Sequence, residues 1–108
     1  MVDKPVAVQM RKWVFETLKL AQPEWRRFGV KRLGVFGSVV RDEANSDSDV
    51  DILVEFERDR KNYDNFLDLA EYLERLMCRK VDLLTPEGLS PYLGPHILKE
   101  VRYVSDEC

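Results

Sequence analysis

Apolar residues recur every three or four positions in two long parts of the chain, which predicts two amphipathic helices. The first pattern covers residues 4–21, where Pro5 suits the first turn and Pro23 ends the pattern. The second covers residues 64–77 and carries charged residues on the opposite face. Its apolar positions are Phe66, Leu69, Ala70, Leu73, Leu76 and Met77.

Shorter apolar runs predict the strands of a sheet. Residues 30–36 and 50–56 each have the length and alternation of a strand, and residues 79–85 contain a shorter one. Residues 101–104 are expected to form a last strand at a sheet edge. In each strand, alternate side chains are expected to point to opposite faces, so that only one face of the second strand carries its acidic residues.

Two short helical segments complete the predicted order of elements. One begins at Ser38, directly after the first strand, and the other covers residues 95–100. Helices therefore alternate with strands along the chain. This order predicts the α/β or α+β class, with a small mixed β-sheet and flanking helices, in a single domain spanning residues 1–108.

Charge and composition exclude several classes of protein. The chain has 17 basic and 20 acidic residues and a net charge of -3, which gives no general electrostatic case for nucleic-acid binding. No run reaches 18 apolar residues and the N-terminus has no apolar signal region, so we expect no membrane segment and a cytoplasmic location. The two cysteines and single histidine lack the paired spacing of a zinc site.

Acidic residues gather around the start of the second strand. Asp49 and Asp51 are separated by one residue, so in an extended chain both side chains point the same way, opposite to Val50. Their repulsion would be relieved by a divalent cation, and magnesium prefers such oxygen ligands. Asp82 interrupts the third apolar strand in a similar way. The Asp49–Asp51 pair or Asp82 alone is also typical of solvated acids. Together, the three carboxylates could hold two magnesium ions, an arrangement that suits nucleophilic displacement at a phosphorus atom.

The turn before these acids has the composition of a phosphate-binding segment. Gly37 allows the backbone to approach a phosphate closely, and Ser38 adds a hydroxyl at the start of the predicted short helix. Arg41 follows three residues later and is a candidate to hold the same phosphates. Taken alone, a Gly-Ser pair after a strand is often only a turn.

Three other assignments stay open at this stage. Arg41 could instead pair with Asp42 or Glu43 on a solvated helix. The proline-broken segment 86–98 could offer an apolar surface to a partner or simply cover the edge of the sheet. His96 is favoured as a surface or helix-end residue over a catalytic base.

These residues resemble a known signature. Gly37-Ser38, ten residues, and then Asp49-Val50-Asp51 is similar to the GS-x10-D-x-D signature of the DNA polymerase β-like nucleotidyltransferase superfamily. The run SDVDILV also matches its S-D-x-D-hydrophobic form. The small size and the later segment FLDLAEYLERLMCRKVDLLTPEGL resemble the minimal nucleotidyltransferases, the MNT or MntA-like proteins. The resemblance spans roughly residues 6–104.

The resemblance implies a polymerase β-like fold, an enzyme and a partner. Such proteins are antitoxins that transfer AMP from ATP to a tyrosine of a HEPN-domain (HepT-like) ribonuclease toxin, with magnesium as the metal. The implied metal-binding and catalytic residues are Asp49, Asp51 and Asp82, and the implied nucleotide-binding residues are Gly37, Ser38 and Arg41. No direct contact with nucleic acid is expected.

Two other functions stay open, and one departure from the family pattern is visible. The chain could neutralise a toxin by complex formation alone, or it could modify a small molecule. A domain this small has little room for an acceptor pocket of its own, which favours a partner protein as the acceptor. Many relatives carry Ala-Arg-Gly where this chain has Val40-Arg41-Asp42, so Asp42 adds a negative charge near the predicted phosphate site.

Overall fold

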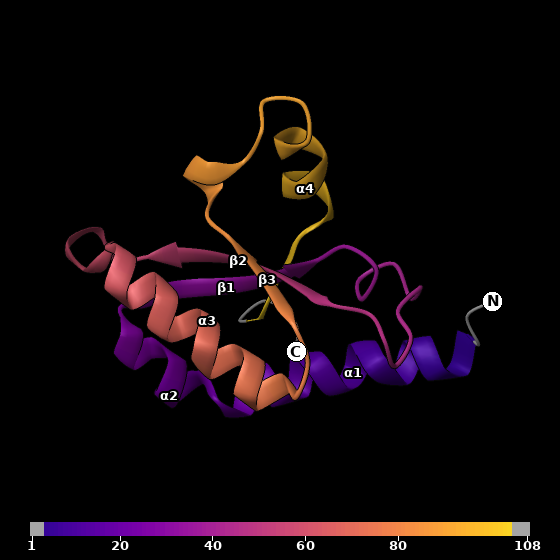
Figure 1. Ribbon diagram of the computed structural model, residues 1–108. Coiled ribbons are helices and arrows are strands. Elements are labelled where there is room, and N and C mark those ends of the chain that lie inside the picture. The colour runs from indigo at the N-terminus through magenta and orange to yellow at the C-terminus, as the bar shows by residue number, and fades with distance from the viewer. Residues whose placement is uncertain (1–3, 105–108) are drawn as a thin grey trace.

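The computed structural model describes residues 4–104 of the chain (Figure 1). The elements are α1 (Lys4–Leu20), α2 (Gln22–Trp25), β1 (Val30–Phe36), β2 (Val50–Phe56), α3 (Tyr63–Met77), β3 (Val81–Leu84), α4 (Gly94–Glu100) and β4 (Arg102–Tyr103), with 3₁₀ turns at Arg26–Phe28, Arg58–Arg60 and Pro86–Gly88. None of the described helices is long and apolar enough to cross a lipid bilayer.

The four strands form one mixed sheet in the order β3-β2-β1-β4. β1 pairs antiparallel with β2 and with β4, whereas β2 and β3 run parallel and are joined through α3. The predicted mixed sheet and its flanking helices are therefore confirmed. The short β4 lies at the edge of the sheet, as its sequence predicts.

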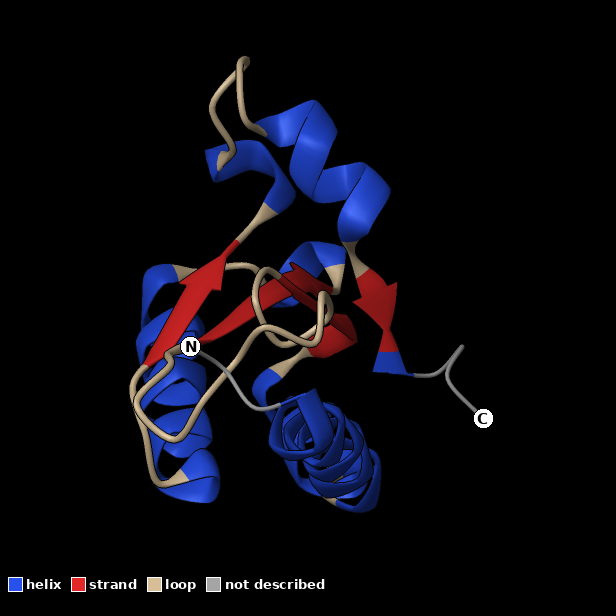
Figure 2. Cartoon of the chain, turned by 90° about the vertical axis from the view of Figure 1, so that its right-hand side faces the viewer, coloured by secondary structure: helices blue, strands red, loops and turns tan. Residues whose placement is uncertain are grey.

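One face of the sheet is covered by α1, α2 and α3, which lie on the same side of it in Figures 1 and 2. The predicted apolar stripe of α3 is correct, since Leu69, Leu73 and Met77 are all fully buried. At the other end of this layer, the indole Nε1 of Trp25 donates a hydrogen bond to the carbonyl of Leu18 at 2.8 Å. This bond satisfies the buried indole and fixes the corner between α1 and α2.

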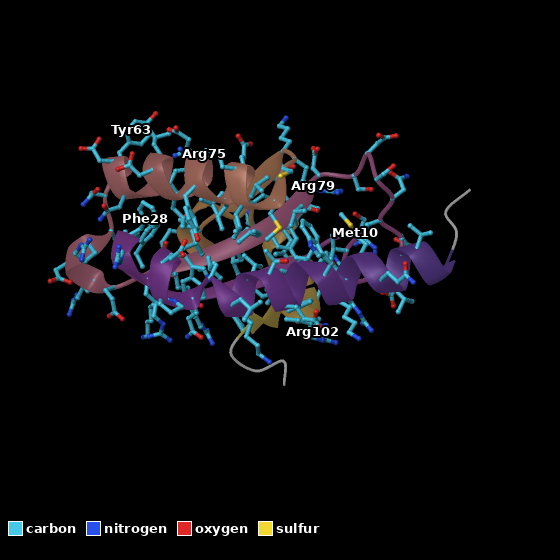
Figure 3. The ribbon with its side chains drawn as sticks, turned by 90° about the horizontal axis from the view of Figure 1, so that it is seen from below. Met10, Phe28, Tyr63, Arg75, Arg79 and Arg102 are labelled. Atoms are coloured by element: carbon cyan, nitrogen blue, oxygen red, sulfur yellow. The ribbon has the colours of Figure 1, made fainter. Side chains whose placement is uncertain are left out.

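A ring contact joins α3 to the segment after α2. The rings of Phe28 and Tyr72 have centroids 5.4 Å apart and are tilted by 43°. In Figure 3, Phe28 lies between α3 and the segment that contains α2. The aromatic pair therefore adds a specific contact to the burial of apolar surface in this layer.

The opposite face of the sheet is covered by the segment 86–98 and α4. Phe36, Leu53 and Val101 form a second, smaller apolar cluster there, against which Leu89 and Ile97 pack. The proline-broken segment thus covers a face of the sheet and not its edge, which corrects one of the two readings of its sequence. Its remaining large apolar side chains, Tyr92, Leu93 and Leu98, are exposed.

The helix predicted to begin at Ser38 does not form beyond a single turn. The amide of Arg41 donates to the carbonyl of Gly37, and the chain then reverses, with Glu43 N donating to Ser38 O at 2.9 Å and Asp42 N to Val39 O at 3.3 Å. This pair of bonds is a Schellman motif, which ends a helix through a residue of left-handed conformation. That residue is Asp42, with φ of 59°.

The buried stripe of α3 leads to a test of stability. We expect Leu73→Ala to lower the free energy of unfolding by about 2–5 kcal/mol, because Leu73 is fully buried and its truncation leaves a cavity. Leu67 lies on the same helix but is 45% exposed, so Leu67→Ala is the matched control and should cost less than about 1 kcal/mol. Urea unfolding followed by circular dichroism measures both, and equal losses would contradict the packing described here.

Candidate active site

The pairing of two parallel strands places two acids beside each other. Asp51 on β2 is the direct register partner of Asp82 on β3. Val50 and Ile52, on either side of Asp51, are fully buried on the helix-covered face, so Asp51 points to the opposite face. Adjacent residues in register share a face, and the two carboxylates therefore emerge together.

This proximity changes the acidity of Asp51. Partial burial, followed by the negative charge of Asp82 and a hydrogen bond with it, raises the pKa of Asp51 from 3.8 to about 6. The charge of Asp49 raises it further, while Arg41 lowers it.

Asp49 precedes β2 and its side chain is exposed. Within residues 4–104, no three acidic, histidine or cysteine side chains already lie close enough together to hold a metal ion. The donor set nonetheless suits magnesium, because Asp51 and Asp82 supply paired hard oxygen ligands and Asp49 lies near enough to raise the pKa of Asp51.

Gly37 directly follows β1 and lies against Asp51. Its φ is +76°, the left-handed region that glycine adopts without strain, and a β-carbon built there would collide with Oδ2 of Asp51. The backbone can therefore approach the acid only because residue 37 lacks a side chain. Ser38 follows it and is half-buried.

A pocket of about 290 Å³ brings the two parts of the site together. Its lining includes Gly37, Arg41 and Asp51 from the predicted signature, which confirms that the fold gathers these residues in one place. Leu93 and His96 of the segment around α4 line the same pocket. His96 is exposed, as its sequence position suggests, but it lies at this site and not on a remote surface.

Arg41 is held by two acids. Its Nε donates to Glu43 Oε1 at 2.7 Å, and its Nη1 lies 3.0 and 2.9 Å from Oε1 and Oε2 of Glu100. Arg41 therefore pairs with Glu43, one of the two acids considered for it, although the helix expected to carry this pair does not form. Asp42, the added acid of this chain, forms an ion pair with Arg11 of α1 at 3.3 Å.

Sequence patterns missed two residues that organise this region. Glu100, at the end of α4, accepts a hydrogen bond from the amide of Gly37 at 2.6 Å. Arg79, in the connection before β3, donates through Nη1 to the carbonyls of Ser46 and Ser48 at 3.4 Å each and so holds the loop that leads to Asp49. An acid in the last turn of a helix is unfavourable to the helix dipole and was the one signal that could have drawn attention to Glu100.

Comparison with known sequences now identifies the family. Residues 17–104 match the family model described as the nucleotidyltransferase domain. The chain belongs to this family. It is 50% identical over 78 residues to the protein adenylyltransferase MntA of Thermococcus cleftensis, covering 72% of this chain and 78% of that protein. A relative from Methanocaldococcus jannaschii, also assigned as a protein adenylyltransferase, is 42% identical over 82 residues, covering 72% of this chain and 80% of the relative.

Solved structures show the same fold. A structure assigned to a minimal nucleotidyltransferase superposes with a TM-score of 0.68 and 36% identity, over 88% of this chain and 93% of that chain. A toxin–antitoxin crystal structure with AMP-PNP gives a TM-score of 0.64 at 20% identity, over 80% of this chain and 71% of that chain. The MNT antitoxin complexed with a tri-AMPylated HEPN toxin of Shewanella oneidensis gives 0.52 at 19% identity, over 91% of this chain and 71% of that chain. This nucleotidyltransferase therefore has the fold predicted by the GS and D-x-D residues.

The raised pKa of Asp51 predicts a pH-dependent effect on stability in metal-free buffer. The folded pKa of about 6 exceeds the unfolded value of 3.8, so the folded state holds the proton more tightly. That stabilisation is complete below about pH 4 and is lost as the pH rises through about 6. The full shift corresponds to about 3 kcal/mol, which solvent screening of the half-buried group reduces to about 1 kcal/mol.

We therefore expect Asp51→Asn to raise the free energy of unfolding by about 1 kcal/mol at pH 7.5, with a gain that shrinks toward pH 4. Urea unfolding in EDTA at several pH values measures the gain. Asp68→Asn, at an exposed position of α3, is the control and should give no such pH dependence. A gain from Asp51→Asn that is the same at every pH would contradict the electrostatic account.

The contact of Gly37 with Asp51 gives a second test of the site. Gly37→Ala should lower the free energy of unfolding by about 1–3 kcal/mol, because the new β-carbon meets the carboxylate and the backbone is left-handed. Gly88→Ala is the matched control, since a β-carbon there would meet only Thr85 Oγ1 at 3.4 Å. Thermal unfolding of the two variants compares the effects. If Gly37→Ala left the stability unchanged, the backbone of Gly37 would not be packed tightly against the carboxylate of Asp51.

Proposed function

We propose that this chain is the antitoxin of a HEPN/MNT pair and transfers AMP from ATP to a tyrosine of its HEPN toxin, thereby neutralising the toxin. The observation that carries the proposal is the meeting of Gly37 with Asp51 in one pocket, where Asp51 has Asp82 as its register partner on β3. That arrangement sets backbone and side-chain donors for phosphate next to oxygen ligands for a cation. The relatives named as protein adenylyltransferases support the same activity.

Magnesium and ATP have separate places in this proposal. Asp49, Asp51 and Asp82 would hold magnesium, with one or two ions bound. The bound metal would neutralise phosphate charge and activate the attacking hydroxyl. The amide of Gly37 and the guanidinium of Arg41 would bind phosphate oxygens, and Ser38 would add its hydroxyl.

The reaction is a displacement at the α-phosphorus of ATP. The tyrosine oxygen forms a bond to that phosphorus, and the bond from the phosphorus to the oxygen bridging the α- and β-phosphates breaks. Pyrophosphate leaves with the electron pair, and the phenolic proton passes to a carboxylate of the site. Asp82 is our candidate for this role, because its side chain is exposed and it is the register partner of Asp51.

The apolar residues beside the pocket are consistent with a protein as the acceptor of AMP. Leu93 lines the pocket and is 62% exposed, and the neighbouring Tyr92 is 85% exposed. Exposed apolar side chains at the rim of a polar site are typical of a surface that a partner covers. The solved complexes of an MNT antitoxin with a HEPN toxin support the choice of partner.

The decisive experiment measures the intact mass of the HEPN toxin after incubation with the antitoxin, ATP and magnesium. The wild-type chain should add one or more AMP units. The double variant Asp49→Asn with Asp51→Asn should lower the rate by at least about 100-fold, because it removes the charges that hold the metal.

Asp47→Asn is the matched control, since Asp47 is an exposed acid in the loop just before the strand, and this variant should keep near wild-type transfer. Unchanged transfer by the double variant would contradict the assignment of these acids. Neutralisation of the toxin by the double variant with no gain of mass would instead favour an antitoxin that acts by complex formation alone.

A further inference from the structure

A side chain of the protein already occupies the place proposed for phosphate. Glu100 Oε1 accepts from the amide of Gly37 at 2.6 Å and from Arg41 Nη1 at 3.0 Å, and its Oε2 accepts from the same nitrogen at 2.9 Å. These are the amide and the guanidinium that the proposed function assigns to the phosphates of ATP. A carboxylate presents two oxygens that share a negative charge, as a phosphate does, and so satisfies both donors.

The position of Glu100 depends on those two donors. It is the last residue of α4, and a negative charge at the C-terminal end of a helix is unfavourable to the helix dipole. Asp51 lies against the other side of Gly37, so two carboxylates approach one glycine from different directions. The carboxylate of Glu100 is therefore stabilised locally by Gly37 and Arg41 against repulsion from its surroundings.

Release of Glu100 does not require the fold to open. The side chain of Glu100 is 26% exposed and can turn toward solvent about its own bonds, while Arg41 keeps its contact with Glu43 at 2.7 Å. The neighbouring Val101 and Ile97 remain packed in the cluster on the sheet. The change needed is thus a rotation of one side chain.

We propose that Glu100 acts as an internal competitor for the phosphate subsite, so that a nucleoside triphosphate must displace its carboxylate from Gly37 and Arg41 in order to bind. This inference rests on the proposed function, because it takes the pocket to be the nucleotide site. Glu100 is then the residue that sets the affinity for ATP. When the triphosphate binds, the Gly37 amide and the Arg41 guanidinium exchange their hydrogen bonds to the Glu100 carboxylate for hydrogen bonds to the phosphates.

The test compares ATP affinity with and without the carboxylate. Calorimetric titration with a non-hydrolysable ATP analogue and magnesium should give a dissociation constant about tenfold lower for Glu100→Gln than for the wild type, equivalent to about 1.4 kcal/mol. Glu100→Ala should also lower the dissociation constant for the analogue. Glu43→Gln is the matched control, because Glu43 also pairs with Arg41 but has no bond to Gly37, and its effect should stay below about threefold.

A second readout follows the contact itself. In ¹H–¹⁵N spectra, the amide signal of Gly37 should move on Glu100→Gln in the absence of nucleotide, and it should move again when the analogue binds. The proposal that Glu100 competes with phosphate would be wrong if the Glu100 variants bound the ATP analogue no more tightly than the wild type. It would also be wrong if the Gly37 amide signal did not respond to the substitution. The Glu100 variants could bind the ATP analogue more tightly while neither they nor the wild type transfers AMP to a toxin. That result would contradict the proposed function and still support competition between Glu100 and phosphate.

Discussion

Asp51 and Asp82 are neighbours because β2 and β3 pair in parallel, with these two residues in direct register. The helix α3 makes this possible, since it carries the chain from the end of β2 back to the start of β3 while it buries Leu69, Leu73 and Met77 on the sheet. The same pairing sends Val50 and Val81 into the core. A shift of one residue would bury the acids and expose the valines, so the apolar core itself holds the carboxylates together.

The electrostatic cost of this arrangement explains the other parts of the site. Partial burial and then the adjacent carboxylate of Asp82 raise the pKa of Asp51 to about 6. Two residues of the same pocket, Gly37 and Arg41, offer an amide and a guanidinium near this acid. Gly37 brings its backbone against Asp51, and Arg41 lowers the pKa of that acid through its charge. Glu100 pairs with the guanidinium of Arg41. These contacts support the proposal that an anion and a cation bind together in this pocket.

The sequence predicts most of the fold, because the helices and strands are encoded in local patterns, and it draws attention to the acids that interrupt the apolar strands. Periodicity identifies α3 and the strands, and the one-residue spacing of Asp49 and Asp51 places them on one side of an extended chain. The prediction of a short helix beginning at Ser38 was wrong, because the chain reverses through Asp42. This residue has a left-handed conformation, which local propensity assigns to glycine. Glu100 and Arg79 could not be predicted, since their partners lie 63 and 31–33 residues away along the chain.

The most direct test of this account is a crystal structure of the protein with a non-hydrolysable ATP analogue and magnesium. The account predicts a metal ion bound between Asp51 and Asp82, a phosphate oxygen within hydrogen-bond distance of the Gly37 amide, and Glu100 turned away from it. Phosphates bound outside this pocket, with Glu100 still on Gly37 and no metal at the paired acids, would contradict the central claim.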